Sequence, residues 1–121
     1  MAEPTVSRPG EGEMHDRDDG YRLIRVDRPD IGAIEISFDE SLVVDPHTHD
    51  DQTDSFLVLE GEVIFTAGDD EVTLGPGGFI SSPAGARHGF RSAGGTARVL
   101  NLHTPGGGFV DGIRRTTAQN G

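Results

Sequence analysis

Turn-forming residues recur along most of this 121-residue chain and separate short apolar segments of strand length. The chain has 18 glycines and 7 prolines, and they are spread out rather than gathered in one linker. Strand-like segments bounded by such turns roughly every 8–12 residues are typical of an all-β sandwich or barrel. No stretch shows the apolar stripe of a helix of ordinary length. We therefore predict an all-β fold, and the length suits a single domain.

The chain divides into three parts by composition and residue pattern. Residues 1–20 are polar, and we expect them to be mostly flexible or held only as an edge strand. Strand patterns begin at Tyr21, and alternation is clear over residues 31–38, so the barrel is expected to span residues 21–104. Residues 105–121 open with a proline and three glycines, and we expect a C-terminal tail with a short helix near residues 110–115.

The charge balance excludes one class of partner. The formal charge is −11, and all the cationic side chains are arginines. A phosphate backbone is bound by neutralising it with basic residues, so we expect no nucleic-acid partner. No charged-then-apolar leader opens the chain, and no apolar run approaches a membrane span. We expect a cytoplasmic protein with no membrane partner.

His47 and His49 stand two positions apart in a predicted strand. Side chains alternate along a strand, so both rings leave the same face and can converge on one ion. The chain has no cysteine, so any metal site must use imidazole and oxygen ligands. A single pair at this spacing is not specific for metal.

Asp54 supplies the nearest carboxylate after the two histidines. The polar segment 50–53 can reverse the chain, and we expect Asp54 to begin the neighbouring antiparallel strand beside the histidine pair. The period of two then places Phe56 on the cavity face. Leu57 and Leu59 fall on the opposite face, which also needs cover, most simply from a second subunit.

His88 follows a tight turn and opens another predicted strand with Phe90 on its face. Three histidines and a carboxylate form a nitrogen and oxygen site that suits Fe(II), Mn(II), Ni(II), Zn(II) or Cu(II). Such a site leaves positions open for water, dioxygen or a chelating substrate. The alternative is a metal-free barrel whose polar interior binds a ligand through hydrogen bonds.

At these residues the chain resembles the cupin superfamily, and in particular small single-domain, quercetinase-like bacterial cupins. The first matching motif is Asp45-Pro46-His47-Thr48-His49, four residues, Asp54, six residues and Gly61, and the second is Gly77, five residues, Pro83-Ala84-Gly85, two residues and His88. The resemblance implies a conical double-stranded β-helix, or jelly roll, that is usually a homodimer and holds one divalent metal at its wider mouth. The implied ligands are His47, His49, Asp54 and His88.

Two positions depart from the family pattern. Aspartate stands at position 54 where the family usually has glutamate, and serine stands at position 92 where it usually has asparagine. The shorter carboxylate leaves three alternatives: direct ligation after a small backbone shift, contact through a water, or a site of three histidines alone. A carboxylate that is not tied to the metal is well placed to serve as a catalytic base.

The resemblance does not imply one reaction, because cupins include enzymes of several classes as well as binding proteins. We favour a metal-dependent dioxygenase acting on a small oxygen-rich molecule. A redox-neutral isomerase or cyclase, or a non-catalytic module that binds a small ligand or metal, is the alternative. We expect the substrate pocket to include Gln52, Phe56, Phe90 and His103. His103 shares a strand face with Asn101 and either points into the cavity or ends the strand in solvent.

Overall fold

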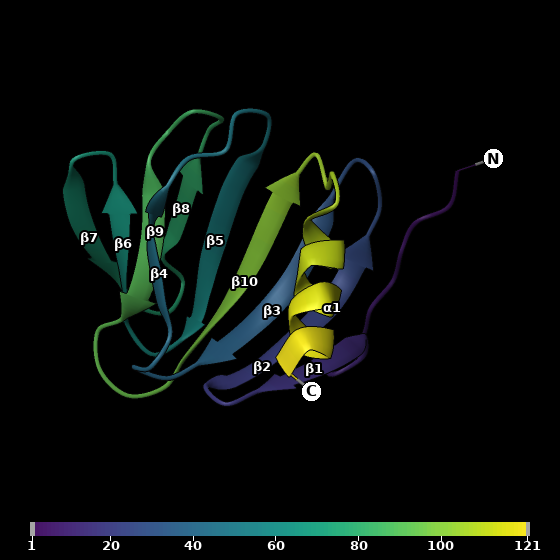
Figure 1. Cartoon of the computed structure of the whole chain (residues 1–121), viewed down its shortest axis with the longest axis horizontal. Helices are drawn as coiled ribbons and strands as arrows, with labels where there is room; N and C mark the ends of the chain where they lie inside the picture. The colour runs from purple at the N-terminus through teal and green to yellow at the C-terminus, as the bar shows by residue number, and fades with distance from the viewer. Residues whose placement is uncertain (1, 121) are drawn as a thin grey trace.

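The computed structural model describes residues 2–120, with side chains as far as residue 116, and shows two antiparallel sheets that face each other (Figure 1). One sheet has the strand order β1-β2-β3-β10-β5-β8, and the other has the order β4-β9-β6-β7. The strands are β1 (Glu13–Arg17), β2 (Gly20–Asp27), β3 (Gly32–Phe38), β4 (Val43–His47), β5 (Thr53–Glu60), β6 (Val63–Ala67), β7 (Asp70–Leu74), β8 (Phe79–Ser82), β9 (His88–Ser92) and β10 (Ala97–Thr104). The all-β prediction is confirmed.

Both ends of the chain add an element to this sandwich. The segment 13–17 forms β1, which pairs with β2 at the edge of the larger sheet. After the glycine-rich segment, α1 (Phe109–Asn120) packs against β1, β2 and β3, as Figure 1 shows in yellow. The helix therefore covers β1, β2 and β3, the part of the larger sheet that the four-stranded sheet does not cover.

Both apolar and charged contacts hold the helix against the larger sheet. Val110 is only 2% exposed and joins the hydrophobic core. Arg114 pairs with Glu13 of β1 at 2.8 Å and with Asp27 of β2 at 2.9 Å. The hydrogen bond from Arg114, followed by that with His15, lowers the pKa of Glu13 to about 2. These ties hold α1 over the sheet at neutral pH.

Phenylalanines fill the space between the sheets. Phe38 and Phe65 are at most 2% exposed, and Phe56 and Phe90 pack with their ring centroids 5.1 Å apart. The alternation of each strand sends these rings inward, as the sequence predicts. Phe79 differs, because it lies on the outer side of β8 and is 56% exposed.

The central strands of the larger sheet, β3, β10 and β5, form one wall of the interior. Their registers set Asn101 opposite Ile34 on one side and opposite Phe56 on the other. Two residues further along β10, on the same face, His103 lies directly opposite Asp54 of β5. Cross-strand neighbours on one face lie close enough for their side chains to interact. The register therefore brings two polar side chains, 49 positions apart in the numbering, into one buried pair.

The facing wall is made by β4 and β9, and its register sets His47 directly opposite His88. The ladder shifts between Val44 and His47, as at a β-bulge, and Gly89 packs against this irregular segment. A Cβ at Gly89 would lie 2.5 Å from the carbonyl oxygen of Val44 and 2.9 Å from the nitrogen of Pro46. Glycine at this position lets β4 approach β9 closely enough to pair the two histidines.

Replacing Gly89 by alanine should push β4 away from β9, because both clashing atoms belong to backbone. We expect a loss of about 1–3 kcal/mol in the free energy of unfolding, as for other overpacked positions. Urea denaturation measures this change. Gly94→Ala is the control, since a Cβ there meets nothing within 4 Å. Equal stability of the two variants would contradict the role given to Gly89.

Candidate metal centre and cavity

Three histidines, from the ends of β4 and β9 and from the loop between β4 and β5, meet at one point. The nitrogen ligand atoms of His47, His49 and His88 all lie within 4.8 Å of one another. The Nε2 atoms of His47 and His49 are 3.3 Å apart. The backbone N–H of Gly85 donates to the carbonyl of His49 at 2.7 Å, which ties the His49 loop to the turn ahead of His88.

The backbone fixes which ring nitrogen faces the site. The Nδ1–H of His47 donates to the carbonyl of Asp45 at 2.8 Å, and that of His88 donates to the carbonyl of Ala86 at 3.0 Å. In a neutral ring, the proton on Nδ1 leaves Nε2 with a free lone pair. A ligand histidine is typically oriented by a hydrogen bond of this kind. Both rings are thus held in the tautomer that binds a metal through Nε2.

His49 is also favoured in its neutral form. Burial lowers the pKa of its imidazole, and the neighbouring rings of His47 and His88 lower it further. A neutral imidazole is the form that binds metal, so protons compete less for this ligand.

The Nε2 atom of His88 tests whether the site fits an ion. It is buried and has no hydrogen-bond partner among the described residues, although Asp54 Oδ2 lies 3.1 Å away. A buried polar atom without a partner is costly and calls for an explanation such as an ion. A divalent metal would satisfy this atom and the two neighbouring imidazoles together, so the donor set fits a transition metal.

Asp54 is buried beside the histidines and is held through one of its oxygens. The side chain of Asn101 donates to Oδ1 at 2.6 Å, and Nε2 of His103 lies 3.1 Å from the same oxygen. The other oxygen, Oδ2, lies 4.0 Å from Nε2 of His49. Burial raises the pKa of Asp54, but the hydrogen bond and charge of His103, with the hydrogen bond of Asn101, outweigh it and leave the pKa below its usual value. Asp54 is therefore a carboxylate at neutral pH.

His103 points into the interior and is only 3% exposed. Its Nδ1–H donates to Oε1 of Gln52 at 3.2 Å, while Nε2 of Gln52 donates to the carbonyl of Gly106 at 3.1 Å. The ring of Phe109 stacks on the His103 imidazole with centroids 3.5 Å apart and planes 5° from parallel. The sequence raised His103 as a candidate but gave it no partner, since its pairing with Asp54 depends on strand register.

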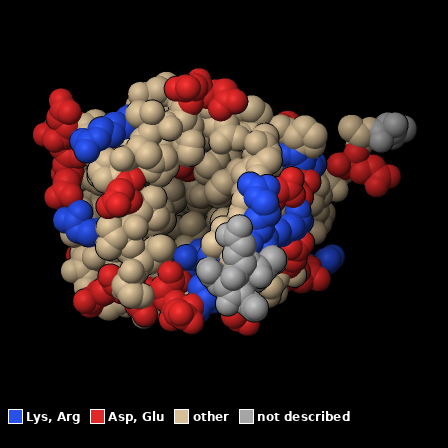
Figure 2. All heavy atoms as spheres, viewed as in Figure 1, with Lys and Arg blue, Asp and Glu red and all other residues tan. Residues whose placement is uncertain are grey.

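A cavity of about 240 Å³ opens onto these groups. Its apolar wall includes Ile34, Ile36, Val44, Phe56, Phe90 and Phe109, and Arg22 also lines it. Figure 2 shows the hollow in the face that carries α1, with acidic side chains mainly around the rim of the molecule. Of the predicted pocket residues, Phe56, Phe90 and His103 line the cavity, whereas Gln52 reaches it only through His103.

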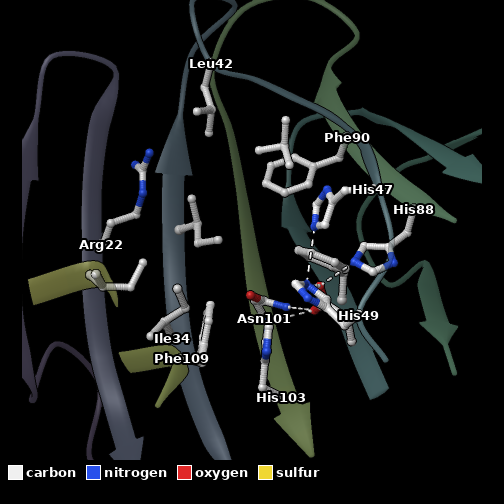
Figure 3. Close-up of a pocket in the computed structure, with 15 residues that line it drawn as sticks. Arg22, Ile34, Leu42, His47, His49, His88, Phe90, Asn101, His103 and Phe109 are labelled. Atoms are coloured by element: carbon white, nitrogen blue, oxygen red, sulfur yellow. Dashed lines mark hydrogen bonds and ion pairs between the residues drawn. The ribbon is translucent and has the colours of Figure 1, made fainter. Parts of the chain in front are cut away.

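One expectation about the route to this site is wrong. Asp54 does not begin a strand paired with the strand of His47, because β5 pairs with β10 and β8, whereas β4 pairs with β9. The segment 48–52 instead crosses from one sheet to the other. Asp54 therefore reaches the histidines from the facing wall. Figure 3 shows Asn101 and His103 on β10 of that wall, across the cavity from His47 and His88.

Comparison with known proteins places this chain in a family. The model of the cupin domain matches residues 36–103, more than half of the chain. This protein belongs to the cupin domain family, as the two motifs in its sequence indicate. The chain matches no curated protein in sequence.

Solved structures agree with the family. The KdgF structure from Halomonas sp. is 26% identical, with a TM-score of 0.66 over 70% of this chain and 77% of that one. The TT1209 structure from Thermus thermophilus is 21% identical, with a TM-score of 0.72 over 84% of this chain and 98% of that one. An RmlC-like cupin from Shewanella frigidimarina is 21% identical, with a TM-score of 0.73 over 85% of this chain and 92% of that one. The last two similarities show the jelly-roll fold alone.

The residues that the structure describes include no helix long and apolar enough to cross a membrane.

Proposed function

We propose that this cupin is a metal-dependent enzyme that acts on a small oxygen-bearing molecule, with dioxygenase chemistry favoured. One observation carries the proposal: the Nε2 atoms of His47 and His88 face a cavity in which a buried carboxylate, Asp54, presents a free oxygen. A site for binding alone would have little need for a proton acceptor beside the ligands.

The histidines would hold Fe, Mn, Ni, Zn or Cu, since imidazole suits Fe, Ni, Zn and Cu and a neighbouring carboxylate suits Mn. When bound, the metal supplies a Lewis acid that polarises a substrate oxygen and stabilises an enolate. His47, His49 and His88 would hold the metal, and the apolar cavity that they line would admit the substrate to it.

Asp54 is the proposed general base. Its Oδ1 is bound by Asn101 and His103, so Oδ2 remains to accept a proton from the substrate. Because the pKa of Asp54 is below its usual value, the carboxylate is ready to accept that proton at neutral pH. A base within hydrogen-bond reach of its proton contributes typically about 10²–10⁴-fold to the rate.

The lining of the cavity favours oxygen chemistry. The chain has no cysteine or tryptophan, and none of the lining residues is a methionine or tyrosine. The wall therefore offers few side chains that a reactive oxygen species would attack. Its apolar surface also excludes water from the intermediates of the reaction.

A redox-neutral isomerase or cyclase is the second candidate, and Asp54 supports it equally. In that reaction the proton taken by Asp54 would return to another atom of the substrate, and no oxygen would be consumed. His103 pairs with Oδ1 of Asp54, so Oδ2 would both take and return that proton.

Oxygen uptake separates these candidates. The protein is loaded under argon with Fe(II), Mn(II), Ni(II), Cu(II) or Zn(II) and then given quercetin or 4-methylcatechol in air-saturated buffer. Metal-dependent uptake of one dioxygen per substrate consumed would support the dioxygenase. Exchange of substrate C–H with D₂O without uptake would support the redox-neutral reaction. Binding of both probes with neither outcome would contradict an enzyme acting on this class of substrate.

We also propose that the protein is a homodimer joined through the outer face of the larger sheet. On that face Leu57 lies opposite Leu100 on one side and opposite Phe79 on the other, so the three form a continuous apolar patch. The chain carries a formal charge of −11, yet all three positions of this patch are apolar.

Light scattering after gel filtration tests the dimer. We expect the wild-type mass to be twice 12.9 kDa and Leu100→Glu to give a monomer. Val43→Glu is the control, since Val43 is 55% exposed on the other sheet. A wild-type protein that is monomeric at about 100 µM would contradict the proposal.

A further inference from the structure

We propose that His103 and Asn101 hold Asp54 as a free carboxylate beside the three-histidine metal site rather than within it, which makes His103 a positioning residue. The inference deepens the proposed function and in part rests on it, since it assigns how the base is kept available. It concerns the ligand set and the support of Asp54, and each step follows from contacts in the described residues.

The grouping of ligand atoms is the first observation. The atoms of His47, His49 and His88 form a cluster in which every pair lies within 4.8 Å, and Asp54 does not join that cluster. Donors bound to one ion at about 2.0–2.2 Å cannot lie much more than about 4.4 Å apart. The three imidazoles are thus nearly assembled. Oδ2 of Asp54 lies 3.1 Å from Nε2 of His88 and 4.0 Å from Nε2 of His49, but Asp54 does not join the group that includes His47.

The cost of moving the carboxylate is the second observation. Its Oδ1 accepts from Asn101 at 2.6 Å and lies 3.1 Å from Nε2 of His103. All three side chains are only 3–4% exposed, so each depends largely on its protein partners. Turning Oδ1 toward the metal would separate it from Asn101 and His103, and a buried polar group left without its partner is costly. Aspartate also lacks the extra methylene that would let Oδ2 advance without this loss.

Two contacts, one with Gln52 and one with Phe109, hold His103 itself, which is why it can fix another residue. Its Nδ1–H donates to Gln52, and Gln52 donates in turn to the carbonyl of Gly106. Phe109, the first residue of α1, stacks on the face of the ring. The segment that leads into α1 thereby sets the orientation of His103, beside which Figure 3 shows Phe109. His103 in turn sets the orientation of Asp54.

This arrangement leaves Oδ2 as the oxygen of Asp54 that neither Asn101 nor His103 holds. Oδ2 lies 3.1 Å from Nε2 of His88 and 4.0 Å from Nε2 of His49, so it borders the metal position without being tied to it. A substrate oxygen or carbon bound at the metal would lie next to Oδ2. A carboxylate that the metal does not neutralise is the stronger proton acceptor.

The test uses Co(II) alone as a probe, because its visible spectrum reports the number and kind of coordinating atoms. We expect Asp54→Asn to leave the Co(II) spectrum unchanged and the Kd within about threefold of wild type. A direct ligand would instead cost well over the 10–100-fold that is typical for a residue that only supports one. A changed spectrum together with such a loss would overturn the proposal.

His103→Leu tests the positioning role. Without His103, the carboxylate can turn both oxygens to the metal, so we expect a weaker, shifted Co(II) absorption and a Kd about tenfold lower. His103→Gln, whose amide can donate to Oδ1, should restore the wild-type spectrum, and His15→Leu is the matched control on the edge strand β1.

The double variant Asp54→Asn/His103→Leu separates positioning from a structural effect, since coupled residues give non-additive changes. We expect it to regain the wild-type spectrum, because no carboxylate remains to move. An unchanged spectrum in His103→Leu, or a change that persists in the double variant, would overturn the role of His103. Because these readouts need no substrate, they stand even if oxygen uptake and proton exchange both fail and the proposed function is wrong.

Discussion

Replacing His88 by alanine is expected to abolish tight binding of divalent metal. His88 supplies a buried Nε2 whose lone pair is aimed at the site by the hydrogen bond from its Nδ1–H to Ala86. Residues that only orient a ligand already contribute about 10–100-fold to metal affinity, so loss of a ligand should raise the Kd more than about a hundredfold. His47→Ala should behave in the same way, since His47 is its cross-strand partner. Titration with Zn(II) against a competing chelator measures both.

The stability of the same variant gives an independent readout. A metal that binds only the folded protein stabilises it by mass action, so Zn(II) should raise the melting temperature of the wild type. It should leave that of His88→Ala unchanged. His15→Ala is the control, because His15 pairs with Glu13 on β1 and lies outside the three-histidine cluster. A His88→Ala variant with wild-type affinity would show that the cluster is not the metal site.

Replacing Asp54 by asparagine is expected to remove most of the turnover while the metal stays bound. Asparagine keeps the shape of the side chain and its hydrogen bond from Asn101, but it cannot accept a proton. We expect kcat to fall about 10²–10⁴-fold, which is the usual contribution of a general base. KM should change little, because the substrate oxygen still binds at the histidine site.

Asp50→Asn is the matched control for this experiment. Asp50 is an exposed carboxylate in the loop that precedes β5, and it is not among the residues that line the cavity. We expect it to retain wild-type kcat. Activity of Asp54→Asn within twofold of wild type, measured as oxygen uptake or as proton exchange, would remove Asp54 from the mechanism.

Local patterns in the sequence were sufficient to find the histidines and most of the strands. The rings of His47 and His49 do converge, but the expectation that both lie on one strand is wrong, because β4 ends at His47 and His49 lies in the following loop. His88 follows from its motif after Pro83-Ala84-Gly85. The strands follow from alternating apolar residues between turns, because each alternation is set by neighbours along the chain. The same reasoning correctly sends Phe56 and Phe90 into the interior.

The partners of Asp54 could not be predicted, because they depend on pairing between strands far apart in the sequence. The loop 48–52 looks like a hairpin turn, yet it carries the chain from one sheet to the other. The pairing of Asp54 with His103 follows only once the register between β5 and β10 is known. The contribution of Phe109 needs the placement of α1 as well, which no periodicity along the chain encodes.

The most direct test of the account is to count metal ions in the purified protein. The protein is expressed with Fe, Mn, Ni, Zn and Cu in the medium, and elemental mass spectrometry is compared for wild type and His88→Ala. The account predicts close to one divalent transition metal per wild-type chain and almost none in the variant. A metal-free wild type whose melting temperature no divalent ion raises would contradict the central claim that these three histidines form a metal site.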